Sequence, residues 1–429
     1  MKDFCLRHGL LLDMDATMGG IETFRDEIRR GLEGNEASSL KALPSYIDPS
    51  RGVDSSENVI VMDAGGTNLR VALVSFTEGR PETVYFENHP MPGITGAHSP
   101  DEFFGELASR LAPLAGKAAK IGICFSFPAE ILPNRDARII NITKEIRVPG
   151  AEGMLVWERI RDALKRQGLE HDKKAAVLND TTAALLGATA CAGGRLFDGY
   201  IGLILGTGTN TCYVERNENV KKAPQLASIP GKTIINLESG GYSRAPRTDV
   251  DIQFDAKTDI PGSQMFEKMI SGAYQGRLFH EFLKTAAQEG CFSREFSQAL
   301  DGVSVITGKD IGEFCDFPYG DGVLAALAGE NEKDRESMYT LIDAFFDRIA
   351  RLITINLTAV LSQMDAGKKP YLPVCISAEG TTFYKTKLFR PKLDYYMDLC
   401  ARRNMGLHYE FVRTENCVLF GTAAAGLLA

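Results

Sequence analysis

Two glycine-rich segments of the sequence have the composition of phosphate-binding turns. The first is Gly65-Gly66-Thr67-Asn68, after the apolar run 59–62, and the second is Gly206-Thr207-Gly208-Thr209-Asn210, after the apolar run 201–205. Glycine lets the backbone turn sharply and leaves its N–H groups open to an anion. Neither segment matches G-x-x-x-x-G-K-[ST] or G-x-G-x-x-G, which excludes Walker A and Rossmann sites. Each turn, taken alone, is more typical of an ordinary hairpin.

The two segments repeat one pattern, with Thr67 and Thr209 at equivalent positions. In each, an apolar strand enters a tight turn that ends in Thr-Asn, and a second apolar strand follows. The repeat predicts a duplicated α/β unit whose two turns face one cleft. Chance similarity of two strand-turn-strand segments is the alternative.

Carboxylates at two strand ends could act on a phosphate or a substrate. Asp63 ends the run 59–62, and a carboxylate beside phosphates is repelled unless a cation intervenes, so we predict that Asp63 orients a hydrated Mg²⁺. Asn179-Asp180 follows the apolar run 175–178, where catalytic groups gather in α/β folds. Asp180, taken alone, fits a helix N-cap better than a catalytic role.

Three further polar residues are of the type that binds sugar hydroxyls. Gln264 and Glu267 are three apart in the predicted first turn of a helix opened by 261–263, so they share one face. Glu238 lies in a glycine-rich loop with no helix to complement. Paired hydroxyls need rigid carboxylate and amide acceptors, which these residues offer. Glu267 could instead stabilise the helix dipole.

Taken in order along the chain, these motifs resemble the hexokinase family, the ATP-dependent kinases of glucose and related hexoses. The resemblance covers most of the chain and includes Ser39–Pro44, Asp63–Arg70, Ser126-Phe127-Pro128, Thr143-Lys144, Asn179-Asp180-Thr181, Gly206–Asn210, Glu238 and Pro261–Lys268.

The resemblance implies a role for each matching residue. Asp180 would be the general base, with Lys144 beside it as a second catalytic residue. The substrate-binding residues would be Ser126, Phe127, Thr143, Lys144, Asn179, Asp180, Asn210, Glu238, Gln264 and Glu267. The ATP-binding residues would be Asp63, Gly65, Gly66, Thr67, Asn68, Arg70, Thr207, Gly208, Thr209, Gly380 and Thr381. Mg²⁺ would be held indirectly, through water, by Asp63 and Asp180.

The sequence also departs from the family pattern. The family usually has Trp before Thr143 and after Glu238, where this chain has Ile142 and Ser239, so the sugar preference stays open. Residues 377–379 match the adenosine motif less well than 380–383 do. The chain runs out at Ala429, which predicts a short final helix with weaker packing on the small domain.

Composition narrows the class of protein. The net charge of −8, from 48 Lys+Arg and 56 Asp+Glu, is spread along 429 residues, which disfavours nucleic-acid and membrane-surface partners. No apolar run approaches about 18 residues, so membrane spanning and secretion are disfavoured. Nine scattered cysteines and six histidines without metal spacing predict reduced thiols, a cytoplasmic location and no zinc site.

The elements that must position these residues predict an α/β protein. Apolar strands at 59–62, 121–125 and 175–178 alternate with helical patterns at 21–32, which begins after Gly19-Gly20, and at 99–111 and 157–164. The resemblance implies a two-lobed actin-like ATPase (ribonuclease H-like) fold with a deep interdomain cleft. The small domain would be 50–178 plus 416–429, and the large domain 1–49 plus 179–415.

The predicted function is ATP- and Mg²⁺-dependent phosphorylation of the 6-hydroxyl of a hexose, glucose first. A kinase for mannose, fructose or an N-acetylhexosamine is the nearest alternative. A sugar sensor without turnover would be expected to lack Asp180 or Asp63, and both are present. An actin-like or chaperone ATPase would share the phosphate hairpins but has no reason to carry the set Ser126, Lys144, Glu238 and Glu267. Both a monomer and a homodimer stay open.

Overall fold

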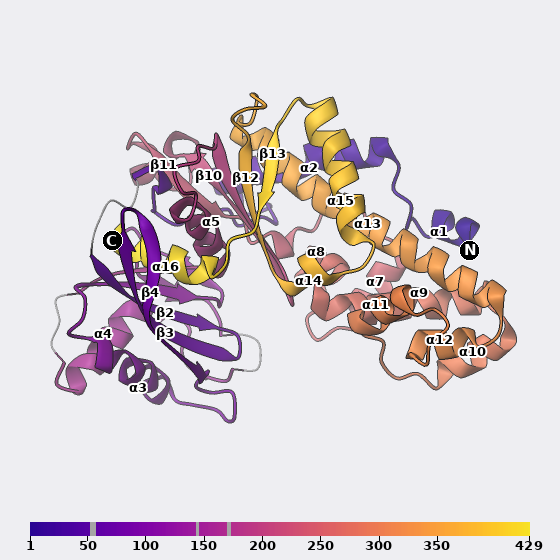
Figure 1. The fold of residues 1–429 in the computed structure, drawn as a ribbon, viewed down its shortest axis with the longest axis horizontal. Helices are drawn as coiled ribbons and strands as arrows, with labels where there is room; N and C mark the ends of the chain where they lie inside the picture. Colours follow the sequence, from indigo (N-terminus) through magenta and orange to yellow (C-terminus); the bar gives the residue numbers. More distant parts are fainter. Residues whose placement is uncertain (52–56, 143–145, 170–172) are drawn as a thin grey trace.

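The computed structural model of the chain contains two β-sheets joined by helices (Figure 1). It describes residues 1–51, 57–142, 146–169 and 173–429. The six-stranded sheet has the order β1 (Leu43–Pro44), β11 (Lys232–Asn236), β10 (Thr209–Arg216), β9 (Gly199–Leu205), β12 (Val374–Glu379), β13 (Tyr409–Val412). The five-stranded sheet has the order β4 (Arg80–Pro90), β3 (Asn68–Thr77), β2 (Asn58–Gly65), β5 (Lys120–Phe125), β8 (Lys174–Leu178).

Both repeated segments are antiparallel hairpins. Strand β2 pairs with β3, and β9 pairs with β10, while β5 and β12 lie parallel to the first strand of each hairpin. Each sheet therefore has a hairpin beside parallel strands, and the predicted repeat is present in three dimensions. A separate small hairpin is formed by β6 (Ala129–Ile131) and β7 (Ala137–Ile139).

Alternate residues of β2 pack into different cores. Ile60 and Met62 face the cluster that includes α3 (Pro100–Leu111) and α4 (Val156–Arg166), whereas Val59 and Val61 face α16 (Cys417–Leu427). This is the period of two expected for a strand buried on both faces. Helix α3 begins after Ser99, which confirms the predicted helix start, and Ser99 and Glu102 form a capping box there.

The short final helix α16 is packed on two sides. It contacts strands β2 and β5 and also α5 (Asp180–Ala190). A Cβ on Gly421 would lie 1.8 Å from the Ala183 carbonyl oxygen, and one on Gly187 would lie 2.0 Å from the Cys417 carbonyl oxygen. Glycine at both positions therefore lets the two helix backbones approach closely.

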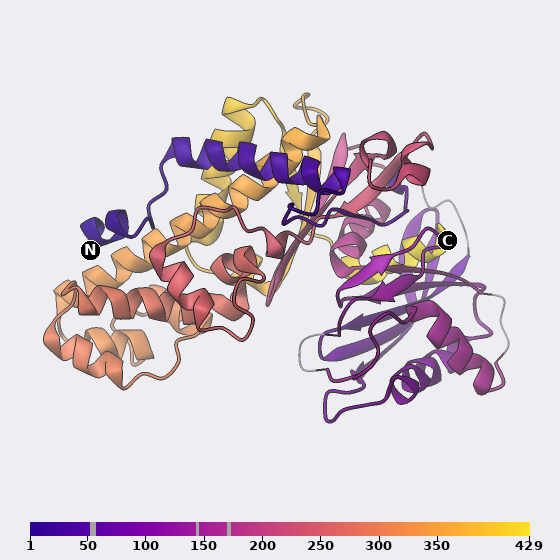
Figure 2. The same ribbon diagram turned by 180° about the vertical axis from the view of Figure 1, so that it is seen from behind.

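The six-stranded sheet is covered by long helices. Helix α2 (Met14–Glu33) lies beside α13 (Glu332–Met364), and Figure 2 shows α2 (indigo) crossing in front of α13 (orange). The prediction that α2 begins after Gly19-Gly20 is wrong, because Asp13 caps the helix and both glycines lie inside it. Gly20 is needed for contact, since a Cβ there would lie 2.7 Å from Ile355 Cδ1. Gly34 ends α2 in the left-handed conformation.

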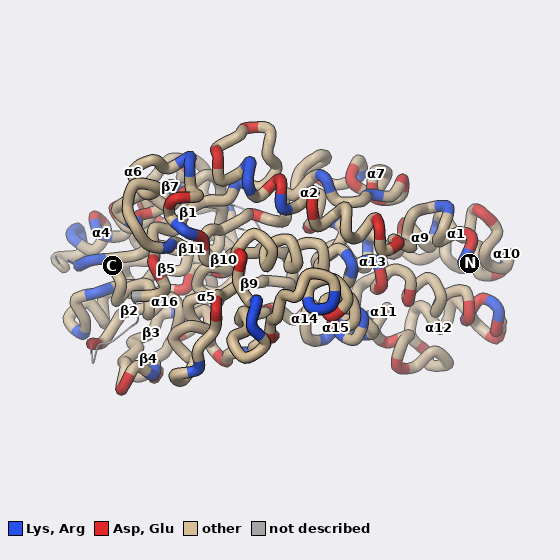
Figure 3. Tube along the Cα trace, turned by 90° about the horizontal axis from the view of Figure 1, so that it is seen from above, with Lys and Arg blue, Asp and Glu red and all other residues tan. Residues whose placement is uncertain are grey.

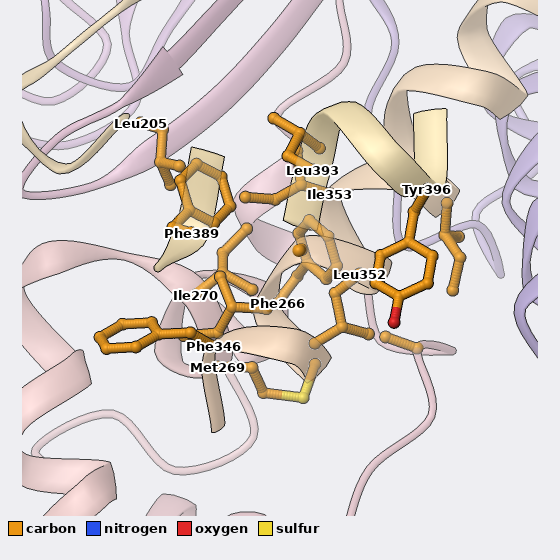
Figure 4. Close-up of a cluster of buried hydrophobic side chains, with 14 of the residues drawn as sticks. Leu205, Phe266, Met269, Ile270, Phe346, Leu352, Ile353, Phe389, Leu393 and Tyr396 are labelled. Carbon is orange, nitrogen blue, oxygen red and sulfur yellow. The ribbon is translucent and has the colours of Figure 1, made fainter. Parts of the chain in front are cut away.

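The remaining helices lie at the end of the molecule opposite α3 and α4 or join the strands (Figure 1). They are α1 (Lys2–Arg7), α6 (Pro224–Ala227), α7 (Asp249–Ala256), α8 (Met265–Ile270), α9 (Gly272–Gln288), α10 (Arg294–Asp301), α11 (Gly308–Asp316), α12 (Val323–Ala328), α14 (Thr381–Lys385) and α15 (Phe389–Met397). Figure 4 shows α8, α13 and α15 meeting in one apolar cluster.

Charged residues are distributed along the whole described trace. Acidic and basic residues alternate along the trace rather than gathering in blocks (Figure 3). In the described ranges, no helix is both long and apolar enough to span a membrane. All nine cysteines are free thiols.

Candidate active site

Beside the turn of the first hairpin, a buried carboxylate pairs with a half-exposed arginine. Asp63, in β2, is 6% exposed, and its Oδ2 accepts a hydrogen bond from Arg70 Nη1 at 3.1 Å. Burial raises the pKa of Asp63 although Arg70 opposes the shift, and the nearby charge of Asp180 raises it further. A Cβ on Gly65 would lie 3.1 Å from Ser126 Oγ, so Ser126 lies against the turn.

The second hairpin is held by its neighbours. The Gly206 carbonyl accepts hydrogen bonds from the Gly272 N–H and from Thr382 Oγ1, both at 2.8 Å. Glu267 Oε2 accepts the Thr209 N–H at 2.9 Å. Gly380, with φ of +113°, packs so closely that a Cβ would lie 2.3 Å from the Leu205 carbonyl oxygen. The predicted adenosine residues Gly380 and Thr381 therefore adjoin the second glycine turn.

The N-cap of helix α5 is Asn179. The alternative interpretation of Asp180 as the N-cap is therefore wrong. Asn179 has extended backbone, and its Oδ1 accepts the Thr181 N–H at 2.9 Å. Asp180 is already the first helical residue, past the N-cap position, although its own Oδ1 also accepts the Thr181 N–H at 2.7 Å. Asp180 is half-buried and lies close enough to Asp63 and Glu238 to raise the pKa of both carboxyls.

A chain of amides joins Asp180's neighbour to Glu238. Asn210 Nδ2 donates to Asn236 Oδ1 at 2.7 Å and lies 3.4 Å from Asn179 Oδ1, and Asn236 Nδ2 donates to Glu238 Oε1 at 2.7 Å. Burial raises the pKa of Glu238, whereas the Asn236 hydrogen bond lowers it. The structure thus brings Asn179, Asn210 and Glu238 together. The sequence prediction missed Asn236, although its place two residues before Glu238 puts both on one face of β11 and its exit.

Two of the predicted sugar residues have left-handed backbone. Glu238 has φ of +54° and Gln264 has φ of +50°, a conformation that costs a non-glycine residue about 1–3 kcal/mol. The prediction that Gln264 lies in the first helical turn is wrong, because α8 begins at Met265 and Gln264 precedes it. A Cβ on Gly240 would lie 2.7 Å from Gln264 Oε1, so the two loops pack directly together.

Comparison with known proteins assigns the family. Two sequence models described as hexokinase match residues 8–190 and 200–428. The chain belongs to the hexokinase family. It is 32% identical over 368 residues to hexokinase-2, chloroplastic, of Nicotiana tabacum, which covers 80% of this chain and 72% of that protein. It is 29% identical over 418 residues to hexokinase-2 of Homo sapiens, covering 92% of this chain and 44% of that protein.

A solved structure of the hexokinase family shares the fold. The hexokinase from Schistosoma mansoni complexed with glucose superposes with a TM-score of 0.79 and 22% identity, over 100% of this chain and 98% of that one. This confirms the predicted two-lobed actin-like ATPase fold. The family match confirms the predicted enzyme class, a hexokinase phosphotransferase.

Several predicted residues of this hexokinase do not show a side chain at the site. Phe127 is 2% exposed, and its ring packs 5.0 Å from that of Phe125, so the side chain belongs to the core. Thr143 and Lys144 lie outside the described residues. Ser239 is fully buried with its Oγ 3.1 Å from Thr211 Oγ1, and its N–H donates to Asn210 Oδ1 at 3.2 Å. Ser239 therefore supports the amide chain by its hydrogen bond to Asn210.

The charged groups fit a divalent cation. The charge of Asp180 disfavours the charged form of Asp63, and a cation between phosphates and carboxylates relieves that repulsion. Within the described ranges, no group of three or more His, Cys, Asp and Glu side chains is arranged to hold a metal directly. The donor set therefore fits a cation carried with its own waters and the nucleotide's oxygens.

Proposed function

We propose that the chain transfers the γ-phosphoryl group of ATP to the 6-hydroxyl of a hexose, with glucose as the first candidate. The observation that carries the proposal is the position of Asp180, which directly follows Asn179 of the amide chain and whose charge also raises the pKa of Asp63. Asp63 adjoins the first glycine turn, and Glu238 belongs to the amide chain. Asp180 is thus close to the predicted phosphate and sugar subsites at once, which is what a general base for this transfer requires.

The sugar subsite is proposed to consist of amide and carboxylate acceptors. Asn179 and Asn210 are oriented by each other and by Asn236, so their remaining polar atoms are fixed for hydroxyls. Glu238 and Glu267 supply charged acceptors for hydroxyls distant from the reacting oxygen. Ser126, Thr143, Lys144 and Gln264 complete the proposed set, and the buried Phe127 packs behind it rather than contacting hydroxyls.

The nucleotide subsite is proposed to lie between the two hairpins. Residues 65–68 and 207–208 offer backbone N–H groups to the phosphates, and Thr209 ends the second turn with its N–H on Glu267. Arg70 adds a positive charge, and Gly380-Thr381 lie near the nucleoside. Mg²⁺ would be oriented through water by Asp63 and Asp180, and it supplies neutralisation of the β- and γ-phosphate charge during in-line attack.

The domain boundaries, location and assembly are also proposals. Packing of α16 on β2 supports grouping 416–429 with 50–178, against 1–49 plus 179–415. We keep the prediction of a cytoplasmic enzyme, although the tobacco relative is named chloroplastic. Either a monomer or a homodimer agrees with this proposal.

The decisive experiment combines a hexose panel with the Asp180→Asn variant. ADP release should depend on an added hexose, and the variant should lose at least about a hundredfold in kcat, because general-base catalysis is worth about 10²–10⁴. Since Asn179 is the cap, the variant should unfold near the wild-type temperature and still bind sugar within roughly tenfold. A folded variant with kcat within about threefold of wild type would remove Asp180 from the mechanism.

The same panel separates the alternatives. Preference for mannose, fructose or an N-acetylhexosamine would keep the mechanism and change the substrate. Sugar binding without ADP release would indicate a sensor. ATP hydrolysis that ignores every sugar would indicate an actin-like ATPase.

A further inference from the structure

The loop between α7 and α8 delivers Gln264 to the proposed sugar subsite and is mostly exposed. Residues 259–263 are all exposed to solvent, and Ile260 is 45% exposed although it is apolar. The loop ends at Gln264, whose left-handed backbone needs support from its surroundings. Helix α8 itself is fixed differently, because Phe266, Met269 and Ile270 are buried in the apolar cluster of Figure 4.

A buried lysine holds this loop from inside. Lys268, on α8, is only 2% exposed, and its Nζ donates hydrogen bonds to Asp255 Oδ1 at 2.5 Å and to the Ile260 carbonyl at 2.7 Å. Asp255, near the end of α7, uses its other oxygen, Oδ2, to accept the Gly262 N–H at 2.8 Å. One ion pair thus connects the end of α7, the tip of the loop and the start of α8.

The Lys268–Asp255 ion pair affects the sugar subsite rather than the nucleotide subsite. Gln264 Oε1 lies beside Gly240, in the loop that carries Glu238, so a shift of the 257–264 loop changes how Gln264 meets the sugar subsite. The second glycine turn is fastened by Gly272, by Thr382 and by Glu267 of α8, a helix that its own buried apolar residues hold in place. Loss of the Lys268–Asp255 ion pair should therefore weaken sugar binding through Gln264 and leave the second glycine turn in place.

We infer that Lys268 and Asp255 are positioning residues for Gln264 and set the affinity of the enzyme for its sugar. This inference rests on the proposed function. Burying a lysine to hold an exposed loop is a poor way to gain stability, because the desolvation cost of a buried ion pair offsets most of its attraction. Its consequence is geometric: it fixes the backbone at 260 and 262, just before the strained residue.

The test replaces the charge and keeps the shape. Lys268→Met should raise the KM for the best hexose by about tenfold, the equivalent of one lost hydrogen bond, with a smaller change in kcat. The KM for ATP should stay within about twofold. Hydrogen exchange of the 257–264 backbone should become faster in the variant. Asp255→Asn, at a less buried position, should show the same pattern and provides the answer if Lys268→Met fails to fold.

A matched control separates positioning from general destabilisation. Arg335 is 8% exposed and holds another loop in the same way, by donating to the carbonyls of Pro318 and Gly329, far along the chain from the sugar residues. Arg335→Met should lower the unfolding temperature and leave the hexose KM unchanged.

Three outcomes would overturn the inference. The first is faster exchange at 257–264 with an unchanged hexose KM, which would leave the proposed function standing. The second is an equal rise of the hexose and ATP KM values, or a hexose KM that rises as much in Arg335→Met. The third is a wild-type chain that releases no ADP with any hexose, which would overturn the proposed function together with the inference.

Discussion

The two glycine hairpins share one sequence pattern but are held in different ways. In the first, Gly66 has φ of +60° and no atom within 4 Å of the place where a Cβ would lie. In the second, a Cβ on Gly208 would lie 2.6 Å from Glu267 Oε2, and its φ is not left-handed. In the first turn glycine allows a left-handed backbone, and in the second it allows the Glu267 carboxylate to approach the backbone closely.

The hairpins differ equally in their charges. The first carries its own charged pair, Asp63 and Arg70, beside the turn. The second has no charged residue in 206–210 and borrows the Glu267 carboxylate from α8. We infer that the first hairpin orients the charged nucleotide and its cation, whereas the second links the nucleotide to the sugar through Glu267.

Asp63→Asn should have the largest effect on this comparison. The amide keeps the size of the side chain and removes the charge that would orient a hydrated cation. Outer-shell metal partners are typically worth about 10–100-fold, so kcat/KM for MgATP should fall by that factor while sugar affinity is retained. The measurement is a steady-state titration of Mg²⁺ at saturating ATP. Unchanged Mg²⁺ dependence with kcat within about threefold would contradict the role of Asp63.

Glu267→Ala and Glu238→Ala should differ from each other. Both should raise the hexose KM by about tenfold to a hundredfold, because each removes a charged hydrogen-bond acceptor. Only Glu267→Ala should also raise the KM for ATP, since it alone bonds the second turn, at Thr209. Matching ATP effects in the two variants would break the proposed link, and an unchanged hexose KM in both would show that the sugar subsite is misassigned.

Gly208→Ala and Gly66→Ala should separate the two uses of glycine. In Gly208→Ala the Glu267 carboxylate must move, so the hexose KM should rise about fivefold, the equivalent of roughly 1 kcal/mol. In Gly66→Ala the new methyl group meets nothing, and the left-handed backbone should cost about 1 kcal/mol of folding stability without changing the hexose KM. Kinetics and denaturant unfolding of the same two proteins test both statements.

Much of this comparison could be predicted from sequence, because local patterns determine it. The offset repeat identified both hairpins, and the helical pattern from residue 99 marked the start of α3. The start of α2 was misplaced, since Gly20 lies in the helix for a contact with Ile355 that is 335 residues away in sequence. Local propensity carries no information about such a contact.

The site was predictable in its residue types and less so in its geometry. The order of the motifs pointed to Asp180 and Glu238, but a preference for N-caps could not decide between Asn179 and Asp180, which are both favoured there. The left-handed backbone of Gln264 is imposed by tertiary packing against Gly240 and leaves no local signal. The buried Lys268 could not be recognised either, since a lysine on a short helix is usually exposed.

The smallest predicted effect is a pH dependence of stability that has opposite signs for Asp63 in the first hairpin and Glu27 in α2. Burial raises the pKa of Asp63 above its unfolded value of about 3.9, so the folded protein binds the proton more tightly. Its contribution to stability is fully present below that value and is lost as pH rises through the folded pKa. Glu27 has the opposite sign, because hydrogen bonds from Ser39 and Arg244 lower its pKa despite burial.

Denaturant unfolding of the wild type, Asp63→Asn and Glu27→Gln without ATP or Mg²⁺ should reveal both signs. As the pH is lowered from 7 towards about 4, the wild type should gain free energy of unfolding relative to Asp63→Asn, since the buried carboxylate becomes protonated. Relative to Glu27→Gln, the wild type should lose free energy of unfolding as the pH is lowered, because the stabilised carboxylate of Glu27 is neutralised. Added MgATP should reduce the Asp63 difference, since a cation favours the charged carboxylate. If the difference in free energy of unfolding between the wild type and Asp63→Asn did not depend on pH, the pKa of Asp63 would be the same in the folded and unfolded protein. The electrostatic reason for a cation at the first hairpin would then be removed.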